Sequence, residues 1–332
     1  MSNETAAKAP GTLGEEFRTC WNQLPNKVFF FVLLAAWLAL FHLYGNSTMG
    51  YSHSPSLLNW LYRAYRGETY KPFEGDDSHG ILIPAAILVL LWYKRRDLFS
   101  QNLRVWPPAL AIVGVSLLLH IFGFLIQQPR VSVLGLFFGI YGLMGLAWGP
   151  GWLRASFFPC ILFAFAVPLG TAIDPITFRL RLFVTNVVVF IGQHILSINV
   201  ACEGTRLFKL PNQYEYEVAA ACSGIRSLVA IIAIAVVYAF MVFKQWWKRI
   251  VMLASAIPLA VIGNTFRLLA IVIAAEIGGQ AEGSAVHESP VWSMLPYIPA
   301  MLGLILIGRW LERSTPKPDP QTPPAVKTST TQ

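Results

Sequence analysis

The chain has 332 residues, of which 55% are hydrophobic and only 13% are charged, and its mean hydropathy is +0.54. Soluble domains carry about 25% charged residues, so this composition excludes an ordinary soluble enzyme and predicts an all-α polytopic membrane protein. The net charge of +8 does not indicate nucleic-acid binding, because the basic residues form short clusters beside apolar runs, as in the cytoplasmic loops of membrane proteins.

The chain begins with a polar segment of mixed charge, and we expect a cytoplasmic lead-in over residues 1–26. Glu15 and Glu16, together with the length of this segment, argue against a cleaved signal peptide. Residues 314–332 are rich in Pro, Thr and Lys and predict a disordered cytoplasmic tail. Between them lies a predicted transmembrane domain over residues 27–313. Its apolar runs, several long enough to cross a core of roughly 30 Å, are 28–45, 80–93, 105–126, 131–149, 152–170, 221–243, 249–275 and 291–311.

One further segment, residues 175–197, is apolar enough to span a membrane but also carries several polar side chains. The positive-inside rule decides its placement. All basic clusters fall on the cytoplasmic side only if this segment lies in the outer interface as an amphipathic helix. We therefore predict about eight transmembrane helices with both termini inside. The basic clusters are Lys94–Arg96 with Arg104, Arg154, Lys244 with Lys248 and Arg249, and Arg309 with Arg313.

With this topology, residues 199–219 lie outside the membrane. Two segments of alternating polarity, 206–210 and 214–218, flank Pro211 and Asn212, which predicts a small outer β-hairpin. The cysteines give no sign of a metal site or of a disulfide framework, because they lie far apart without a CxxC pair. These cysteines are Cys20, Cys160, Cys202 and Cys222.

The most unusual run is Ala-Ala-Cys-Ser-Gly-Ile-Arg-Ser, which contains Cys222, Ser223 and Arg226 at the start of an apolar span. Cys222 and Arg226 are four residues apart, so on a helix they share a face. A cation one turn from a thiol favours the nucleophilic thiolate. Taken alone, a buried cysteine at a helix start is more often an inert small hydrophobe, and Arg226 could instead pair with Glu215 or Glu217.

The predicted topology brings three reactive groups to one level. Cys222 precedes Lys244 by 22 residues, about 33 Å of helix, which places the thiol at the outer membrane surface. Arg267 follows Lys248 by 19 residues, about 28 Å of helix, and reaches the same level from the neighbouring span. His287 falls in the next outer loop. This convergence favours a functional role for Cys222 over inert packing.

The other candidate site residues also have non-catalytic explanations. Arg267, with Asn264 one turn before it, could snorkel to the headgroups, although a charge near the apolar layer is a functional candidate by default. His287 could be an ordinary solvated histidine. His79, in Ser-His-Gly at the outer start of the second span, is a rival general base.

Over most of residues 75–310 the chain resembles the exosortase/archaeosortase family of membrane-embedded cysteine transpeptidases. The resemblance implies that Cys222 is the nucleophile and that Arg267 and His287 complete the catalytic set. The matching residues are Ser78-His79-Gly80 with Lys94-Arg95-Arg96, Phe165-Ala166-Val167-Pro168, Glu203-Gly204 before the Ala-Cys-Ser-Gly-Ile-Arg-Ser block, Asn264, Arg267 and His287.

The expected chemistry is attack of the Cys222 thiolate on a peptide carbonyl, which gives a thioester acyl-enzyme. His287 would act as general acid and base, and Arg267 would stabilise the oxyanion. Supporting or substrate-binding roles are expected for Arg226, Ser223, Asn264 and His79. No metal and no cofactor is expected.

The resemblance implies exported protein substrates with a C-terminal transmembrane sorting signal of the PEP-CTERM kind. Membrane lipids are further expected partners, nucleic acid is not, and the acceptor stays open between water, an amine and a lipid. We expect an integral protein of the bacterial inner (plasma) membrane with its site at the outer, periplasmic face. A transporter or lipid-linked glycan handling protein is the alternative, but it predicts an internal repeat or paired broken helices, and neither is visible. A structural envelope subunit with an inert Cys222 is a third reading.

Overall fold

The computed structural model describes residues 12–48, 54–66, 77–169, 174–209, 214–217, 225–289 and 291–313. These residues are mostly helical and include one small sheet. The chain divides into two compact units, Met1–Phe183 with Glu217–Ala230 and Val184–Tyr216 with Ile231–Gln332.

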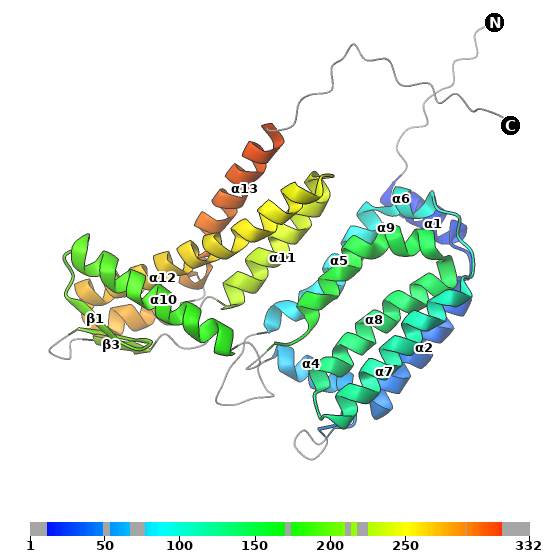
Figure 1. Ribbon diagram of the computed structural model, residues 1–332, viewed down its shortest axis with the longest axis horizontal. Helices are drawn as coiled ribbons and strands as arrows, with labels where there is room; N and C mark the ends of the chain where they lie inside the picture. Colours follow the sequence, from blue (N-terminus) through cyan, green and yellow to red (C-terminus); the bar gives the residue numbers. More distant parts are fainter. Residues whose placement is uncertain are drawn as a thin grey trace, which may run out of the picture. The chain divides into compact units, whose positions relative to one another are not determined.

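Three long helices run side by side in the first unit (Figure 1): α2 (Lys27–Tyr44), α7 (Leu110–Leu125) and α8 (Pro129–Trp148). Most of α8 is buried between its neighbours. Glycines permit this close approach: a Cβ at Gly139 would lie 2.0 Å from the Trp37 ring. The same indole donates a hydrogen bond to the Leu136 carbonyl at 3.1 Å.

The rest of the first unit consists of shorter helices. Gly149, with φ of 92°, ends α8, and Pro150 begins the next helix, where its missing N–H costs no hydrogen bond. The shorter elements are α1 (Leu13–Gln23), α4 (Leu57–Tyr65), η1 (Ser78–Leu82), α5 (Ile83–Tyr93), α6 (Arg95–Phe99), η2 (Pro107–Ala109), α9 (Pro150–Ile161) and η3 (Leu162–Ala166).

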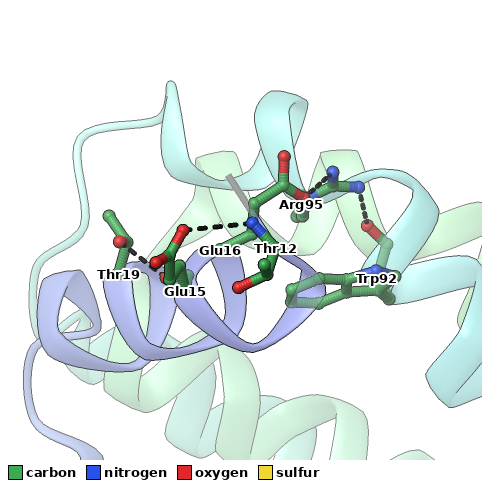
Figure 2. Close-up of polar contacts among 6 residues, drawn as sticks. All are labelled: Thr12, Glu15, Glu16, Thr19, Trp92 and Arg95. Carbon is green, nitrogen blue, oxygen red and sulfur yellow. Dashed lines mark hydrogen bonds and ion pairs between the residues drawn. The ribbon is translucent and has the colours of Figure 1, made fainter. Parts of the chain in front are cut away.

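Helix α1 shows that part of the polar lead-in is folded onto the first unit. Figure 2 shows Arg95 of α6 in an ion pair with Glu16, with Nη2 2.5 Å from Oε2, while Nη1 donates to the Trp92 carbonyl. At the start of α1, the Glu15 carboxylate accepts a hydrogen bond from the Thr12 N–H at 3.1 Å. The basic cluster after the second apolar run therefore also holds the N-terminal helix.

The later elements include one helix far longer than the others. Helix α12 has 43 residues, about 65 Å at 1.5 Å per residue, whereas a span needs about 20 residues. The later elements are α10 (Asp174–His194), β1 (Val200–Glu203), β2 (Arg206–Lys209), β3 (Tyr214–Glu217), α11 (Ile225–Val242), α12 (Trp246–Glu288), η6 (Trp292–Met294) and α13 (Tyr297–Arg313).

The outer hairpin expected over 199–219 is in fact a three-stranded sheet in the order β1-β2-β3. The additional strand comes from a tight turn at Gly204, whose φ of 61° suits glycine. Strands β1 and β2 are antiparallel, and Glu203 pairs with Arg206 across the turn. Glu203 and Gly204, expected only as a motif ahead of Cys222, therefore form a turn that the sequence pattern does not predict.

Four of the described helices are long and apolar enough to cross a membrane, and three shorter apolar helices accompany them. They coincide with predicted apolar runs, and α10 is not among them. The four long helices are Lys27–Tyr44, Pro107–Leu125, Pro129–Trp148 and Trp246–Glu288, and the shorter ones are Ser78–Tyr93, Pro150–Ala166 and Leu228–Val242.

Candidate active site

The candidate site is organised by a sharp kink in α12. Gly279, with φ of 75° and ψ of −167°, is not helical and divides α12 into a long outgoing part and a short returning part, residues 280–288, hereafter the return arm. The backbone at this position suits only glycine. A Cβ at Gly283 on the return arm would lie 2.9 Å from the Ala275 Cβ, so the two parts pack against each other.

The described residues beyond the return arm, 291–313, run antiparallel to the outgoing part of α12 and contact it. Beyond the return arm, the backbone of Pro296 lies against Gly263, where an added Cβ would be 2.2 Å from the Pro296 carbonyl oxygen. Further along, Gly303 lies against the side chain of Leu259. At the far end, the Lys248 ammonium donates to the Leu311 carbonyl. The outgoing part of α12 thus contacts the return arm, Pro296, Gly303 and the end of α13 along its length.

This arrangement brings two predicted site residues together. Arg267 Nη2 donates a hydrogen bond to the His287 carbonyl oxygen at 3.3 Å. The outer loop expected around His287 is wrong, because residues 282–288 are helical and belong to the return arm. Hydropathy alone predicts that this helix ends near residue 275. The return arm contains Ala and Glu, so it is helical without being apolar.

The imidazole of His287 has a pKa below its ordinary value. Partial burial is the main cause, because it disfavours the charged ring, and the positive charge of Arg267 acts in the same direction. The neighbouring carboxylate of Glu288 opposes both effects. His287 lies beyond the kink, outside the length of α12 that a membrane span requires, and the lowered pKa favours the neutral ring, which can accept a proton.

Asn264 lies one turn before Arg267 on the outgoing part of α12. Its side chain is only 2% exposed, and neither its amide nitrogen nor its amide oxygen has a hydrogen-bond partner among the described residues. Arg267 Nε is likewise buried without a partner in this part of the chain. Since buried polar groups are nearly always hydrogen-bonded, these atoms mark a polar position inside the helical packing.

The remaining predicted histidine belongs to the first unit. The His79 ring hydrogen-bonds the backbone of Phe165 and lies near Asp77, whose Oδ1 accepts from the Leu169 N–H at 3.2 Å. The Tyr65 hydroxyl donates to the Ala166 carbonyl. Two segments that carry the family resemblance, around His79 and around Ala166, are therefore packed together in this unit.

Three predicted site residues cannot be placed in the same detail. Cys222 and Ser223 lie outside the described residues, as does the side chain of Arg226, although its backbone forms the first turn of α11. Glu215, one of the alternative partners named for Arg226, is paired with Arg206 at 2.6 Å. In the described parts of the chain, no group of three His, Cys, Asp or Glu side chains could hold a metal ion.

The sequence analysis missed the contacts that hold the return arm, which come from Gln280 and Tyr216. Tyr216 donates its hydroxyl hydrogen to the Gln280 carbonyl at 2.8 Å, and the Gln280 amide pairs with the backbone of Glu215. The available signal was the pair Gly278-Gly279 within an otherwise helical run. Two glycines there favour a break, and a break would have suggested a returning segment.

Comparison with known proteins identifies the family. Residues 72–306, well over half of the chain, match the family model described as transmembrane exosortase (Exosortase_EpsH). No curated protein and no solved structure matches the chain. The matched range includes His79, Cys222, Arg267 and His287, on which the resemblance was based. The chain therefore belongs to the transmembrane exosortase family.

Proposed function

We propose that this chain is a membrane cysteine peptidase or transpeptidase that cleaves C-terminal sorting signals of exported proteins. Membership of the exosortase family implies a sorting protease or transpeptidase in general terms. The assignment of Cys222 as nucleophile, of Arg267 as oxyanion stabiliser and of His287 as general acid and base is our own proposal for this chain.

The observation that carries the proposal is the contact between Arg267 and His287. They come from two parts of α12 joined by the kink at Gly279, and the guanidinium lies 3.3 Å from the His287 carbonyl oxygen. A permanent cation beside a neutral imidazole combines anion stabilisation with proton transfer, the two functions that acyl transfer needs besides a nucleophile.

In the first step, the Cys222 thiolate attacks the scissile carbonyl carbon, a C–S bond forms, and the carbonyl oxygen becomes an oxyanion. The charge of Arg267 stabilises this oxyanion, since arginine stays protonated and cannot serve as a base. Collapse of the tetrahedral intermediate breaks the C–N bond. His287 takes the proton of the Cys222 thiol as the thiolate forms and gives this proton to the leaving amine, and a thioester remains on Cys222.

In the second step, His287 removes a proton from the acceptor, which attacks the thioester and releases the Cys222 thiolate. Water as acceptor gives a cleaved protein, whereas an amine or a lipid headgroup gives a new covalent attachment. Asn264 is suited to bind a substrate backbone amide or to orient Arg267, because its amide has no partner among the described residues. Arg226, Ser223 and His79 are proposed as supporting residues.

For the membrane arrangement we propose eight spans with both termini in the cytoplasm and with α10 in the outer interface. The support is the agreement between the predicted apolar runs and the apolar helices, together with the positive-inside rule. In a bacterial inner membrane the site would then face the periplasm, and a substrate anchored by its C-terminal helix would enter laterally. Labelling of an introduced cysteine in β2 from the outer side only would support this orientation, and labelling from the cytoplasmic side only would contradict it.

The function is tested in cells that express the full chain and a tagged substrate with a C-terminal transmembrane sorting signal. Replacement Cys222→Ala should abolish the appearance of the processed substrate. Cys202→Ala is a matched control, since Cys202 is another free thiol and lies in β1. Unchanged processing by Cys222→Ala would reject the peptidase and leave a transporter or structural protein as the better reading.

A further inference from the structure

Strand β3 is at the edge of the sheet, and a side chain of the return arm pairs with its free backbone groups. Gln280 Oε1 accepts a hydrogen bond from the Glu215 N–H at 2.8 Å, and Gln280 Nε2 donates to the Glu215 carbonyl at 3.1 Å. One side-chain amide therefore satisfies both the donor and the acceptor of Glu215, as a neighbouring strand would. Such pairing covers an edge that would otherwise stay open.

Tyr216 makes the second connection between β3 and the return arm. Its hydroxyl donates to the Gln280 carbonyl at 2.8 Å, and the side chain also hydrogen-bonds Ser284. The ring lies directly on Gly283, where an added Cβ would be 2.1 Å from the hydroxyl oxygen. Gly283 is thus the position that lets the tyrosine reach the backbone of the arm.

The sheet also holds the outgoing part of α12, through Lys209 at the end of β2. The Lys209 ammonium is 2.5 Å from Glu276 Oε1, and both side chains are less than one third exposed. The sheet therefore contacts α12 on both sides of the kink at Gly279. Lys209 binds Glu276, which precedes the kink, and strand β3 binds Gln280, which follows it. This is the arrangement expected of an element that fixes the angle of the kink.

The position of β3 in the chain gives this arrangement a consequence for the proposed chemistry. Strand β3 ends at Glu217, and Cys222 follows five residues later, so covalent geometry keeps it within about 18 Å of the strand end. On the other side of the contact, His287 follows Gln280 by seven residues in the same helical arm.

We propose that Gln280 and Tyr216 are positioning residues, which fix the return arm to strand β3 and thereby set the position of His287 for the proposed reaction. The proposal rests on the proposed function only in its catalytic part. The attachment itself can be measured without activity. Neither residue touches the reacting atoms in this account, and each acts through the arm that carries His287.

The first experiment separates attachment from catalysis in the purified full-length chain in lipid nanodiscs. Hydrogen–deuterium exchange is measured for peptides that cover residues 280–289, in the unsubstituted chain and in Gln280→Ala and Tyr216→Phe. We expect faster exchange in both variants. The matched control is Gln193→Ala, because the Gln193 amide also bonds the sheet backbone, at the Val200 carbonyl at 2.8 Å, but on strand β1. It should leave exchange of the return arm unchanged.

The same variants are then assayed for substrate processing. Gln280→Ala loses the two hydrogen bonds to the Glu215 backbone and should lower kcat by about tenfold. Tyr216→Phe loses the hydroxyl's bonds to the Gln280 carbonyl and to Ser284 and should lower kcat by a similar factor, with KM changed less than kcat. Unchanged exchange in Gln280→Ala would overturn the attachment. Faster exchange with unchanged kcat would overturn the positioning role.

A third variant, Gln280→Glu, tests the pairing by its dependence on pH. A protonated carboxyl group can still accept from the Glu215 N–H and donate to its carbonyl, as the amide does, whereas the carboxylate cannot donate. The kcat of Gln280→Glu relative to the unsubstituted chain should therefore fall as pH rises through the titration of the new carboxyl group. A ratio that is independent of pH would contradict the reciprocal pairing, since general loss of structure would not be restored by a proton.

Failure of the proposed function gives a different pattern from failure of this inference. If Cys222→Ala processes substrate as well as the unsubstituted chain does, the peptidase is rejected and the positioning role falls with it. The exchange data then still decide whether Gln280 and Tyr216 attach the arm to β3. If Cys222→Ala is inactive and Gln280→Ala is indistinguishable from the unsubstituted chain in both measurements, only the positioning inference is rejected.

Discussion

Arg267 and His287 are joined by a hydrogen bond from Arg267 Nη2 to the His287 carbonyl oxygen at 3.3 Å, although twenty residues separate them. The bond uses the backbone carbonyl of His287, so it fixes the position of the return arm relative to the outgoing part of α12. It also keeps a positive charge near the ring, which favours the neutral imidazole. Two residues assigned separate roles are thus structurally and electrostatically coupled.

This coupling predicts the effect of Glu288→Gln on the pH dependence of processing. The pKa of His287 is lowered by burial and by Arg267 and raised by Glu288, so removal of the Glu288 charge should lower that pKa further. If His287 must be neutral to accept a proton, the acidic limb of kcat/KM moves to lower pH. The measurement is a pH–rate profile with a peptide substrate.

Glu282→Gln is the control for this profile, because it removes the same charge from an exposed position of the same arm, six residues before Glu288. Its acidic limb should coincide with that of the unsubstituted chain. A shift of the Glu288→Gln limb to higher pH, or no shift, would exclude His287 as the group that titrates in this limb.

Lys248 predicts a stability effect at the opposite end of α12. Its side chain is 2% exposed, donates to the Leu311 carbonyl near the end of α13, and lies 5.3 Å from the Trp247 ring centroid. Replacement Lys248→Met keeps the apolar stem but leaves a helix-terminal carbonyl without its donor. We expect a loss of roughly 1–3 kcal/mol in the free energy of unfolding, measured as a lower midpoint of thermal unfolding in nanodiscs.

The control is Lys244→Met, which removes the same charge from an exposed position four residues earlier. Any effect of the basic cluster on membrane insertion is common to both variants. Equal unfolding midpoints for the two variants would mean that the contact with Leu311 does not stabilise the pairing of α12 with α13.

Alanine substitutions at two glycines, Gly283 and Gly278, should destabilise the return arm to different extents. A Cβ at Gly283 would lie 2.1 Å from the Tyr216 hydroxyl oxygen and 2.9 Å from the Ala275 Cβ, whereas a Cβ at Gly278 would meet only the side chain of Glu282. Glu282 is exposed, so a change of its side-chain conformation can relieve part of this contact. Gly283→Ala should therefore cost about 1–3 kcal/mol, and Gly278→Ala should cost less.

Hydrogen exchange of the return arm measures this difference directly. Gly283→Ala should expose the backbone of residues 280–289 to faster exchange and should lower processing, while Gly278→Ala should change neither by much. Similar behaviour of the two variants would mean that close packing of Tyr216 on Gly283 does not hold the arm in place.

The extent to which the sequence predicted this structure follows from the kind of signal each element carries. Apolar runs such as 131–149 are read directly from hydropathy, and α8 occupies Pro129–Trp148. Part of the second half of the chain is different, because the return arm and β1 are short and neither has a long apolar run. Their structure is decided by Gly279 and Gly204, whose positive φ angles reverse the chain, and by contacts between residues far apart in sequence.

For the candidate site, the sequence indicated Arg267 and His287 but not the contacts that hold the return arm. The approximate level of Arg267 followed from counting residues along a helix, and His287 does lie beside it, with its carbonyl bonded to the guanidinium. The reason given was wrong, since a loop was expected and a helical return arm is present. Gln280 and Tyr216 carried no signal of their own, because their significance depends on the pairing of an amide with the edge of β3, which only the tertiary structure defines.

Asn264 gives a prediction in which stability and activity change in opposite directions. Its amide is buried, and neither polar atom has a partner among the described residues, a situation that costs roughly 1–3 kcal/mol. Replacement Asn264→Leu removes the polar atoms and keeps the number of side-chain heavy atoms, so the thermal unfolding midpoint should rise. If the amide binds substrate or orients Arg267, processing should fall in the same variant.

Thr265→Val is the matched control, since Thr265 is also buried but its hydroxyl is already bonded to the Val261 carbonyl at 2.9 Å within the helix. It should alter processing little. A variant Asn264→Leu that is more stable and fully active would show that the amide is only an unpaired group in the packing. A variant that is less stable would contradict the expected gain from removing an unpaired amide.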